Sequence, residues 1–165
     1  MFNLVKKPQE TQPCCFSKYM ILSNGNIMAL GEQIEESRGK ITGQRVLNVK
    51  RIPKMETSFA MDGNYKGNPC TDVATYTSVL KEGVLHGKGQ GIVTTKDGQG
   101  IASWTGQGVG KFTGPGKVSF RGAIYFRTPP ASEGGKLSAL NNTVGVFEYE
   151  TDEIGNCSSK TWEWK

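Results

Sequence analysis

Four side chains in the central part of the chain could together form a binding site. They are three aromatic residues and one arginine, which the hairpin pattern described below places on one face of neighbouring strands: Tyr76, Trp104, Tyr125 and Arg121. Rows of glycine share that face and leave space in front of the rings. Aromatic walls around a few polar groups are the usual composition of a small-molecule pocket. We therefore treat these four residues as candidate ligand-binding residues, and a carboxylate or an aromatic compound as the candidate ligand.

An inward Arg121 needs a carboxylate partner, because an isolated buried charge is very unfavourable. Glu148 is the first candidate by strand parity, and Asp72, which shares the face of Tyr76, is the second candidate and a further ligand-binding residue. One interpretation of the pair is a structural salt bridge among packed rings, with no ligand. Another makes Glu148 a catalytic acid or base, which requires a raised pKa, whereas a paired arginine lowers it.

Motifs of metal and cofactor sites are missing from the sequence. His86 is the single histidine, and none of the four cysteines is in C-x-x-C spacing. The glycine runs 87–91 and 106–110 do not complete G-x-G-x-x-G, and there is neither a P-loop nor a G-x-S-x-G elbow. We expect no metal and no cofactor.

Charge and cysteine usage limit the partners and the compartment. The net charge is +5, but no basic run exceeds two residues, so we expect no nucleic-acid partner. No apolar stretch approaches the roughly 18 residues of a membrane span, and the first residues lack the apolar core of a signal peptide. We expect a cytoplasmic protein with free thiols and no membrane partner; a Cys70–Cys157 bridge is the alternative.

Regularly spaced turn signals divide most of the chain into short segments rich in β-branched and aromatic residues. They predict nine candidate strands, near 27–36, 40–50, 55–62, 71–81, 84–96, 99–112, 117–128, 140–151 and 157–164. The fold class is therefore all-β: a single closed antiparallel up-and-down barrel of about eight to nine strands, because closure removes exposed edges. An open two-sheet sandwich is the alternative. Residues 1–23 are expected to form an irregular N-terminal arm and residues 24–165 the barrel domain.

Three predicted hairpins set the register of the central strands. Two-residue loops at Glu82-Gly83 and Asp97-Gly98 place Tyr76 opposite Gly89, and Gly89 opposite Gly106. A four-residue loop at 113–116 then places Tyr125 opposite Trp104 and Arg121 opposite Gly108.

The face of these strands that carries glycines and rings is expected to be the barrel interior, because exposed glycine only weakens a strand. This choice leaves Phe120, Ile124 and Phe126 pointing outward. Such a patch needs a cover, and we expect a homo-oligomer formed through these three residues. If the opposite face is inward, the three residues are core.

The hairpin sequence Gly108-Val109-Gly110-Lys111-Phe112-Thr113-Gly114-Pro115-Gly116-Lys117-Val118 resembles the G-x-G-x-F-x-G-x-x-G-x-V hairpin of allene oxide cyclase-like barrels, a lipocalin-like (calycin) superfamily. The resemblance covers about residues 85–128. It implies an eight-stranded antiparallel barrel, an oligomer, and an uncharacterised microbial member of the superfamily. In the plant enzymes, an inward glutamate and an aromatic cavity act on an epoxide fatty acid; only the fold is carried over here.

These observations favour a barrel that binds a small molecule in its lumen without catalysis. One alternative is a cyclase or isomerase with a lumenal Glu148 as acid or base. The other is a structural, oligomerising barrel without a ligand.

Overall fold

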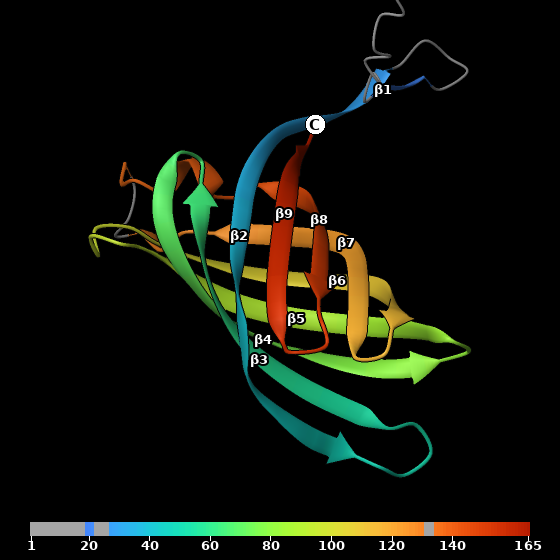
Figure 1. The fold of residues 1–165 in the computed structure, drawn as a ribbon. Helices are drawn as coiled ribbons and strands as arrows, with labels where there is room; N and C mark the ends of the chain where they lie inside the picture. Colours follow the sequence, from blue (N-terminus) through green and yellow to red (C-terminus); the bar gives the residue numbers. More distant parts are fainter. Residues whose placement is uncertain (1–18, 22–26, 131–133) are drawn as a thin grey trace, which may run out of the picture.

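The computed structural model describes residues 19–21, 27–130 and 134–165, which form one sheet closed into a barrel (Figure 1). A short strand, β1 (Tyr19–Ile21), pairs with the start of the long β2. The eight strands of the barrel are β2 (Ile27–Asn48), β3 (Lys54–Tyr65), β4 (Asn68–Lys81), β5 (Val84–Thr95), β6 (Ile101–Gly114), β7 (Lys117–Arg127), β8 (Val144–Thr151) and β9 (Asn156–Trp164).

Each strand pairs with the next along the chain, all pairs are antiparallel, and β2 also pairs with β9. The last pairing closes the barrel, so the prediction of an all-β, up-and-down closed barrel is confirmed. Of the arm predicted for residues 1–23, the described residues include only β1; the remainder lies outside them.

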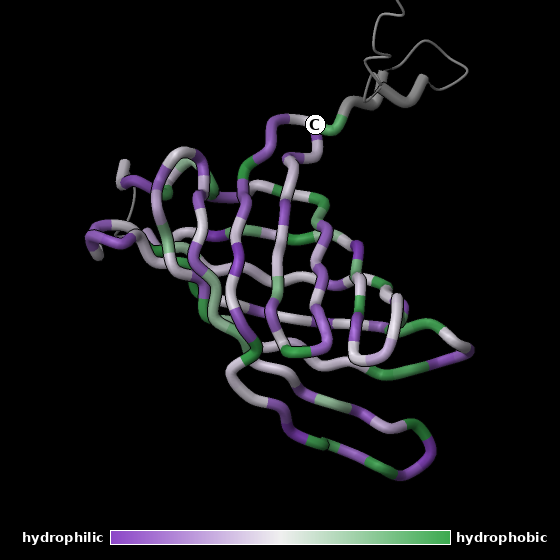
Figure 2. The backbone as a smooth tube through the Cα atoms, in the orientation of Figure 1, coloured by the Kyte–Doolittle hydropathy of each residue, from purple (hydrophilic) through white to green (hydrophobic). Residues whose placement is uncertain are grey.

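Side chains alternate between the lumen and solvent along each strand. Figure 2 shows that hydrophilic and hydrophobic residues are mixed along the strands. In β4, for example, Cys70, Asp72 and Ala74 are buried, whereas the intervening Val73 is 59% exposed. β-branched residues at many outward positions favour the strand conformation without contributing to the core.

The turn predicted at residues 37–39 is not present, and the two segments predicted near 27–36 and 40–50 form the single strand β2. Gly39 lies inside this strand, where an added Cβ would lie 2.0 Å from the carbonyl oxygen of Ala60 on β3. The glycine is there because two strand backbones approach closely, not because the chain turns.

The first two hairpins have the predicted register. Glu82 and Gly83 both have positive φ angles, 52° and 80°, as a two-residue type I′ loop requires. Tyr76 faces Gly89, and Gly89 faces Gly106. Tyr76 and Trp104 therefore point into the barrel, whereas Lys88 and Thr105 are exposed, so the predicted choice of the inward face is confirmed for β4, β5 and β6.

The third hairpin differs from the prediction by one residue. Gly114 pairs with Lys117 across a two-residue Pro115-Gly116 turn, and an irregularity between Phe112 and Gly114 leaves Thr113 without a partner. Because side chains alternate with a period of two, this one-residue difference reverses the two faces of β7.

The reversal overturns the predicted orientation of the side chains on β7. Phe120, Ile124 and Phe126 lie in the core, with 5%, 7% and 1% exposure, and do not form an outer patch. An interface through these three residues is therefore wrong for this fold. Arg121 and Tyr125 point outward instead of into the lumen.

The core consists of two groups of buried side chains at the two ends of the barrel. One includes Phe59, Leu85 and Phe120. The other includes Phe126 together with Leu137 and Leu140, which belong to the connection between β7 and β8. This connection, which contains a 3-10 turn at Ser138–Leu140, plugs one end of the barrel.

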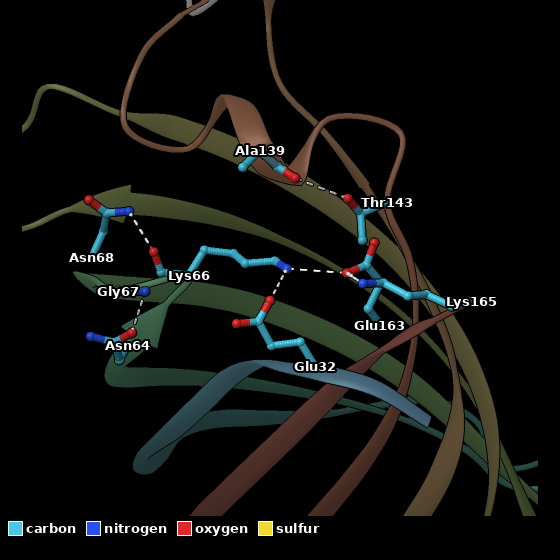
Figure 3. Close-up of polar contacts among 9 residues, drawn as sticks. All are labelled: Glu32, Asn64, Lys66, Gly67, Asn68, Ala139, Thr143, Glu163 and Lys165. Carbon is cyan, nitrogen blue, oxygen red and sulfur yellow. Dashed lines mark hydrogen bonds and ion pairs between the residues drawn. The ribbon is translucent and has the colours of Figure 1, made fainter. Parts of the chain in front are cut away.

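A polar network ties the closing strands together at the rim near this plug (Figure 3). Lys66, in the turn between β3 and β4, lies 3.2 Å from Glu32 on β2 and 3.2 Å from Glu163 on β9. Burial disfavours its charged form, but the two carboxylates outweigh burial and raise the pKa of Lys66. The pairing of β2 with β9 is thereby reinforced by a third element.

Candidate functional site

A cavity lies in the lumen between the two groups of core residues, and all eight strands of the barrel contribute to its lining. The space that the centre of a water molecule can reach is about 70 Å³. A single water needs roughly 10–15 Å³ on the same measure, so the cavity has room for a small organic molecule or several waters. Trp104 and Phe147 pack against both groups and form part of its wall.

Asp72 on β4 is the first of two carboxylates in this cavity, and it is only 2% exposed. The Trp104 indole N–H on β6 donates to both carboxylate oxygens, at 3.1 and 3.0 Å. The Tyr65 hydroxyl on β3 donates to Oδ2 at 3.0 Å. Residues of three strands, β3, β4 and β6, therefore hold the carboxylate in a fixed position.

Glu35 on β2 is the second carboxylate, with 3% exposure. Its oxygens accept hydrogen bonds from three hydroxyls: Ser37 on the same strand, Thr161 at 2.8 Å and Ser159 at 3.2 Å on β9. Glu35 sits where β2 and β9 close the barrel, and Glu35 and Asp72 both border the same lumenal space.

Both carboxylates bind protons more tightly than exposed acids do. Burial raises the pKa of Asp72 to about 7, against the hydrogen bonds from Tyr65 and Trp104, and the charge of Glu35 raises it further. Burial likewise raises the pKa of Glu35, against the bonds from Ser37, Thr161 and Ser159. At neutral pH, Asp72 is therefore divided between its protonated and ionised forms.

A cluster of aromatic rings also borders the cavity. Tyr76 packs edge-on against Phe120 and Tyr149, with centroid distances of 5.7 and 5.8 Å, and Phe59 lies 5.3 Å from Tyr149. The buried Tyr149 hydroxyl lies near Tyr76 and Cys157 but makes no hydrogen bond of good geometry with the described residues. The Tyr149 hydroxyl is therefore a buried polar group among apolar side chains.

Facing glycines on β5 and β6 form the remaining wall. Gly87 is paired with Gly108, and Gly89 with Gly106. A Cβ at Gly87 would lie 2.9 Å from the Phe120 ring, and one at Gly89 would lie 3.0 Å from Tyr76 Cβ. At Gly106 and Gly108, in contrast, a Cβ would approach the backbone oxygens of Ala123 and Arg121 on β7, at 3.1 and 2.4 Å.

The structure brings three of the six predicted site residues together in the cavity: Asp72, Tyr76 and Trp104. Arg121, Tyr125 and Glu148 lie outside it. Arg121 does pair with Glu148, at 3.2 Å, but the two side chains are 75% and 50% exposed. The predicted pairing of Arg121 with Glu148 is therefore correct, but its predicted location in the lumen is wrong. The bulge turns Arg121 on β7 outward, and Glu148, which lies opposite it on β8, also points outward.

Glu35, Tyr65 and the hydroxyls of β9 were not predicted as site residues. Glu35 and Ser37 are two positions apart, as are Ser159 and Thr161, which is the spacing of one strand face. On β2, the spacing of Glu35 and Ser37 could not be recognised as one strand face, because residues 37–39 were predicted to form a turn. Recognising one continuous β2 would have indicated a buried polar cluster beside β9.

Cys70 and Cys157 are buried free thiols in different core groups, so the alternative of a bridge between them is wrong. Within the described residues, no group of three or more His, Cys, Asp or Glu side chains is arranged to hold a metal ion. The same part of the chain contains no helix long and apolar enough to cross a membrane.

Comparison with known proteins supports the fold alone. No protein-family model and no curated protein sequence matches the chain. A conserved protein of unknown function from Rhodopseudomonas palustris has a similar structure, with a TM-score of 0.61 and 9% identity, over 80% of this chain and 95% of that one. A protein of unknown function from Clostridium acetobutylicum gives a TM-score of 0.64 and 11% identity, over 81% and 98% of the two chains.

Proposed function

We propose that this barrel is a binding protein for a small molecule held in its lumen. The observation that carries the proposal is the cavity itself, in which Asp72 is fixed by Trp104 and Tyr65 and faces a space lined with rings. Buried carboxylates disfavour folding unless they are compensated. Their presence beside an open space, and not in a packed core, is what a specific site for a polar guest requires.

Two further features support a guest that is partly polar and partly apolar. The Tyr149 hydroxyl offers an additional hydrogen-bonding group, and the rings of Phe59, Tyr76 and Phe120 offer apolar contact. A carboxylate ligand was expected on the basis of an inward Arg121. Since Arg121 lies on the outer surface, that basis is gone.

Fluorescence of Trp104 tests the proposal, because its indole both lines the cavity and contacts Asp72. The chain has three tryptophans, so Trp162→Phe and Trp164→Phe replacements leave Trp104 as the single reporter. We expect saturable changes in emission with some members of a library of small amines, alcohols and aromatic compounds. Native mass spectrometry of the unaltered protein provides an independent search for a co-purified small molecule.

Two results would contradict the proposal. One is constant Trp104 emission across the library combined with a native mass equal to that of the bare chain. The other is a response that persists when Gly106 is replaced by Leu, a substitution that fills the cavity from its glycine wall.

An acid–base isomerase or cyclase is the second candidate, and the specific observation in its favour is the pKa of Asp72, about 7. A group that exchanges its proton near neutral pH is well suited to general acid–base catalysis. The Asp72→Asn variant should then still bind a convertible ligand but lose its turnover. Unchanged turnover would remove Asp72 from the reaction, and Glu148, on the outer surface, is no longer a candidate for a lumenal acid.

A further inference from the structure

We propose that the guest of the lumen is a cation: a small protonated amine that carries an apolar or aromatic body. This inference rests on the proposed function, since it names the class of ligand for the same cavity. It follows from the two acids and the rings that border the cavity, and from the fact that no ion pair among the described residues includes either acid.

The two lumenal carboxylates have only neutral hydrogen-bond donors among the described residues. Asp72 accepts from an indole and a phenol, and Glu35 accepts from three hydroxyls. None of the ion pairs formed within the described part of the chain includes either acid. In that same part, Lys88 is the one cationic residue that borders the cavity, and it is exposed, on the face of β5 opposite Gly87 and Gly89.

A cationic guest would supply the missing charge. Oδ2 of an ionised Asp72 accepts from both Trp104 and Tyr65, whereas Oδ1 accepts from Trp104 alone and can accept a further bond from an ammonium group. A charge-assisted bond of this kind is stronger than the bonds from neutral donors. An anion, in contrast, would be repelled by both carboxylates.

The rings provide the second half of the recognition. Tyr76, Tyr149 and Phe59 form one cluster with centroid distances between 5.3 and 6.2 Å. The face of an aromatic ring attracts an ammonium group within about 6 Å, and the attraction grows when water is excluded. Acids and rings that border the same cavity therefore suit an amine head group attached to an apolar body.

Proton binding by Asp72 must compete with such a guest. The titratable groups that act on Asp72 or are acted on by it are Glu35, Tyr65, Cys70 and Cys157, all uncharged or anionic, and none supplies a cation. Because ionisation of Asp72 favours the amine, the affinity for an amine should rise with pH through neutrality. The affinity for a neutral molecule of the same shape should not.

Calorimetric titration with matched ligands tests the inference on the complete chain. The probes are benzylamine, benzyl alcohol and benzoate, and the aliphatic set butylamine, butanol and butyrate, at pH 6 and pH 8. We expect one amine to bind at least about tenfold more tightly than its alcohol at pH 8, and the carboxylate to bind most weakly. Between pH 6 and pH 8, the ionised fraction of a group with a pKa near 7 rises about tenfold, and amine affinity should rise by a similar factor.

The Asp72→Asn variant should reduce amine affinity to that of the alcohol and remove the pH dependence. Glu35→Gln provides a second test if Asp72→Asn fails to fold, and the same loss of preference for the amine is expected. Glu148→Gln is the matched control, since it makes an acid-to-amide change on the outer surface. This control should bind the amine as the unaltered protein does.

The outcomes separate the two proposals. If an alcohol or a carboxylate binds as tightly as the amine, the lumen is a binding site but the cationic class is wrong. If none of the six probes binds, the cationic class is wrong; if the library also leaves Trp104 emission constant and no small molecule co-purifies, the binding function is wrong as well.

Discussion

Asp72 occupies an environment that differs strongly from that of an exposed aspartate. An aspartate at 2% exposure, hydrogen-bonded by an indole and a phenol, retains its proton to a much higher pH than it would in the unfolded chain. The shift is a property of burial, and burial is set by the strand parity that places Cys70, Asp72 and Ala74 together on the inner face of β4.

This shift predicts that the protein is more stable in mild acid than at neutral pH. The pKa of Asp72 is about 7 in the folded protein and 3.8 in its ordinary state. The folded chain therefore binds more protons than the unfolded chain between these values. The free energy of unfolding must fall as pH rises through that range, by up to about 1.4 kcal/mol per pH unit. Glu35, whose pKa is also raised, acts in the same direction.

Urea unfolding at pH 4.5, 6 and 8 measures this effect. The Asp72→Asn variant should show a clearly smaller decrease in stability over this range, because the amide that replaces the carboxyl group does not titrate and its oxygen can still accept the hydrogen bond from Tyr65. The Glu148→Gln control should keep the pH profile of the unaltered protein. A profile that Asp72→Asn leaves unchanged would show that Asp72 is not buried as described.

A second prediction at the scale of the residue concerns Gly91, which lies against the Trp104 indole. A Cβ at this position would lie 2.5 Å from Trp104 Nε1 and 2.8 Å from Ala74 Cβ. Gly91→Ala should therefore destabilise the protein by about 1–3 kcal/mol, the usual effect of overpacking, and should shift Trp104 emission.

Gly43→Ala is the matched comparison, since no atom lies within 4 Å of the added Cβ and the backbone angle is unstrained. It should be neutral or stabilise the protein by less than about 1 kcal/mol. Chemical denaturation of both variants decides the point, and equal effects would contradict the close packing of Trp104 against β5.

The strand β7 shows how one residue in a turn determines the orientation of an element. The bulge at Thr113 could not be predicted from residues 113–116. Their sequence is compatible both with a four-residue loop and with a bulge followed by a two-residue turn. The alternation of Phe120, Ile124 and Phe126 was visible, but alternation alone does not specify which side of the sheet is the lumen.

Substitution of one residue on each face of β7 tests its orientation. Phe120 is buried against Tyr76, so Phe120→Ala should destabilise the barrel by about 3–5 kcal/mol. Tyr125, on the opposite face, is 47% exposed, and Tyr125→Ala should change stability by less than about 1 kcal/mol. Thermal unfolding compares the two, and a larger loss for Tyr125→Ala would indicate the register predicted from sequence.

The barrel as a whole was predictable because its signals are repeated along the chain. Turn residues at Glu82-Gly83 and Asp97-Gly98, with alternation between them, specify neighbouring antiparallel strands, and successive hairpins leave two edges that closure removes. The length of β2 could not be predicted from the sequence, because Gly39 resembles a turn glycine. Its actual role, to let the backbones of β2 and β3 approach closely, depends on a different strand. The cavity, similarly, depends on residues from all eight strands.

The plug is a property of the whole molecule, since Leu137 and Leu140 close an end of the barrel to which several strands contribute. Both side chains are buried, so the connection between β7 and β8 is part of the core. Leu140→Ala should reduce the free energy of unfolding by about 2–5 kcal/mol.

Hydrogen exchange of the indole of Trp104 measures whether the plug also seals the lumen. In a single-tryptophan background, Leu140→Ala should accelerate exchange of this indole, whereas Ala139→Gly, at the exposed neighbouring position, should not. Loss of stability without faster exchange would limit the plug to a packing role.

Because of the facing glycines of β5 and β6, one side of the barrel wall presents backbone without side chains to the lumen. The space in the interior therefore depends on the absence of side chains on β5 and β6, at Gly87, Gly89, Gly106 and Gly108. The acids that make the interior polar lie on other strands. Volume and polarity are thus encoded by different residues: the glycines of β5 and β6 leave space in the barrel, and Glu35 on β2 and Asp72 on β4 give that space its polar character.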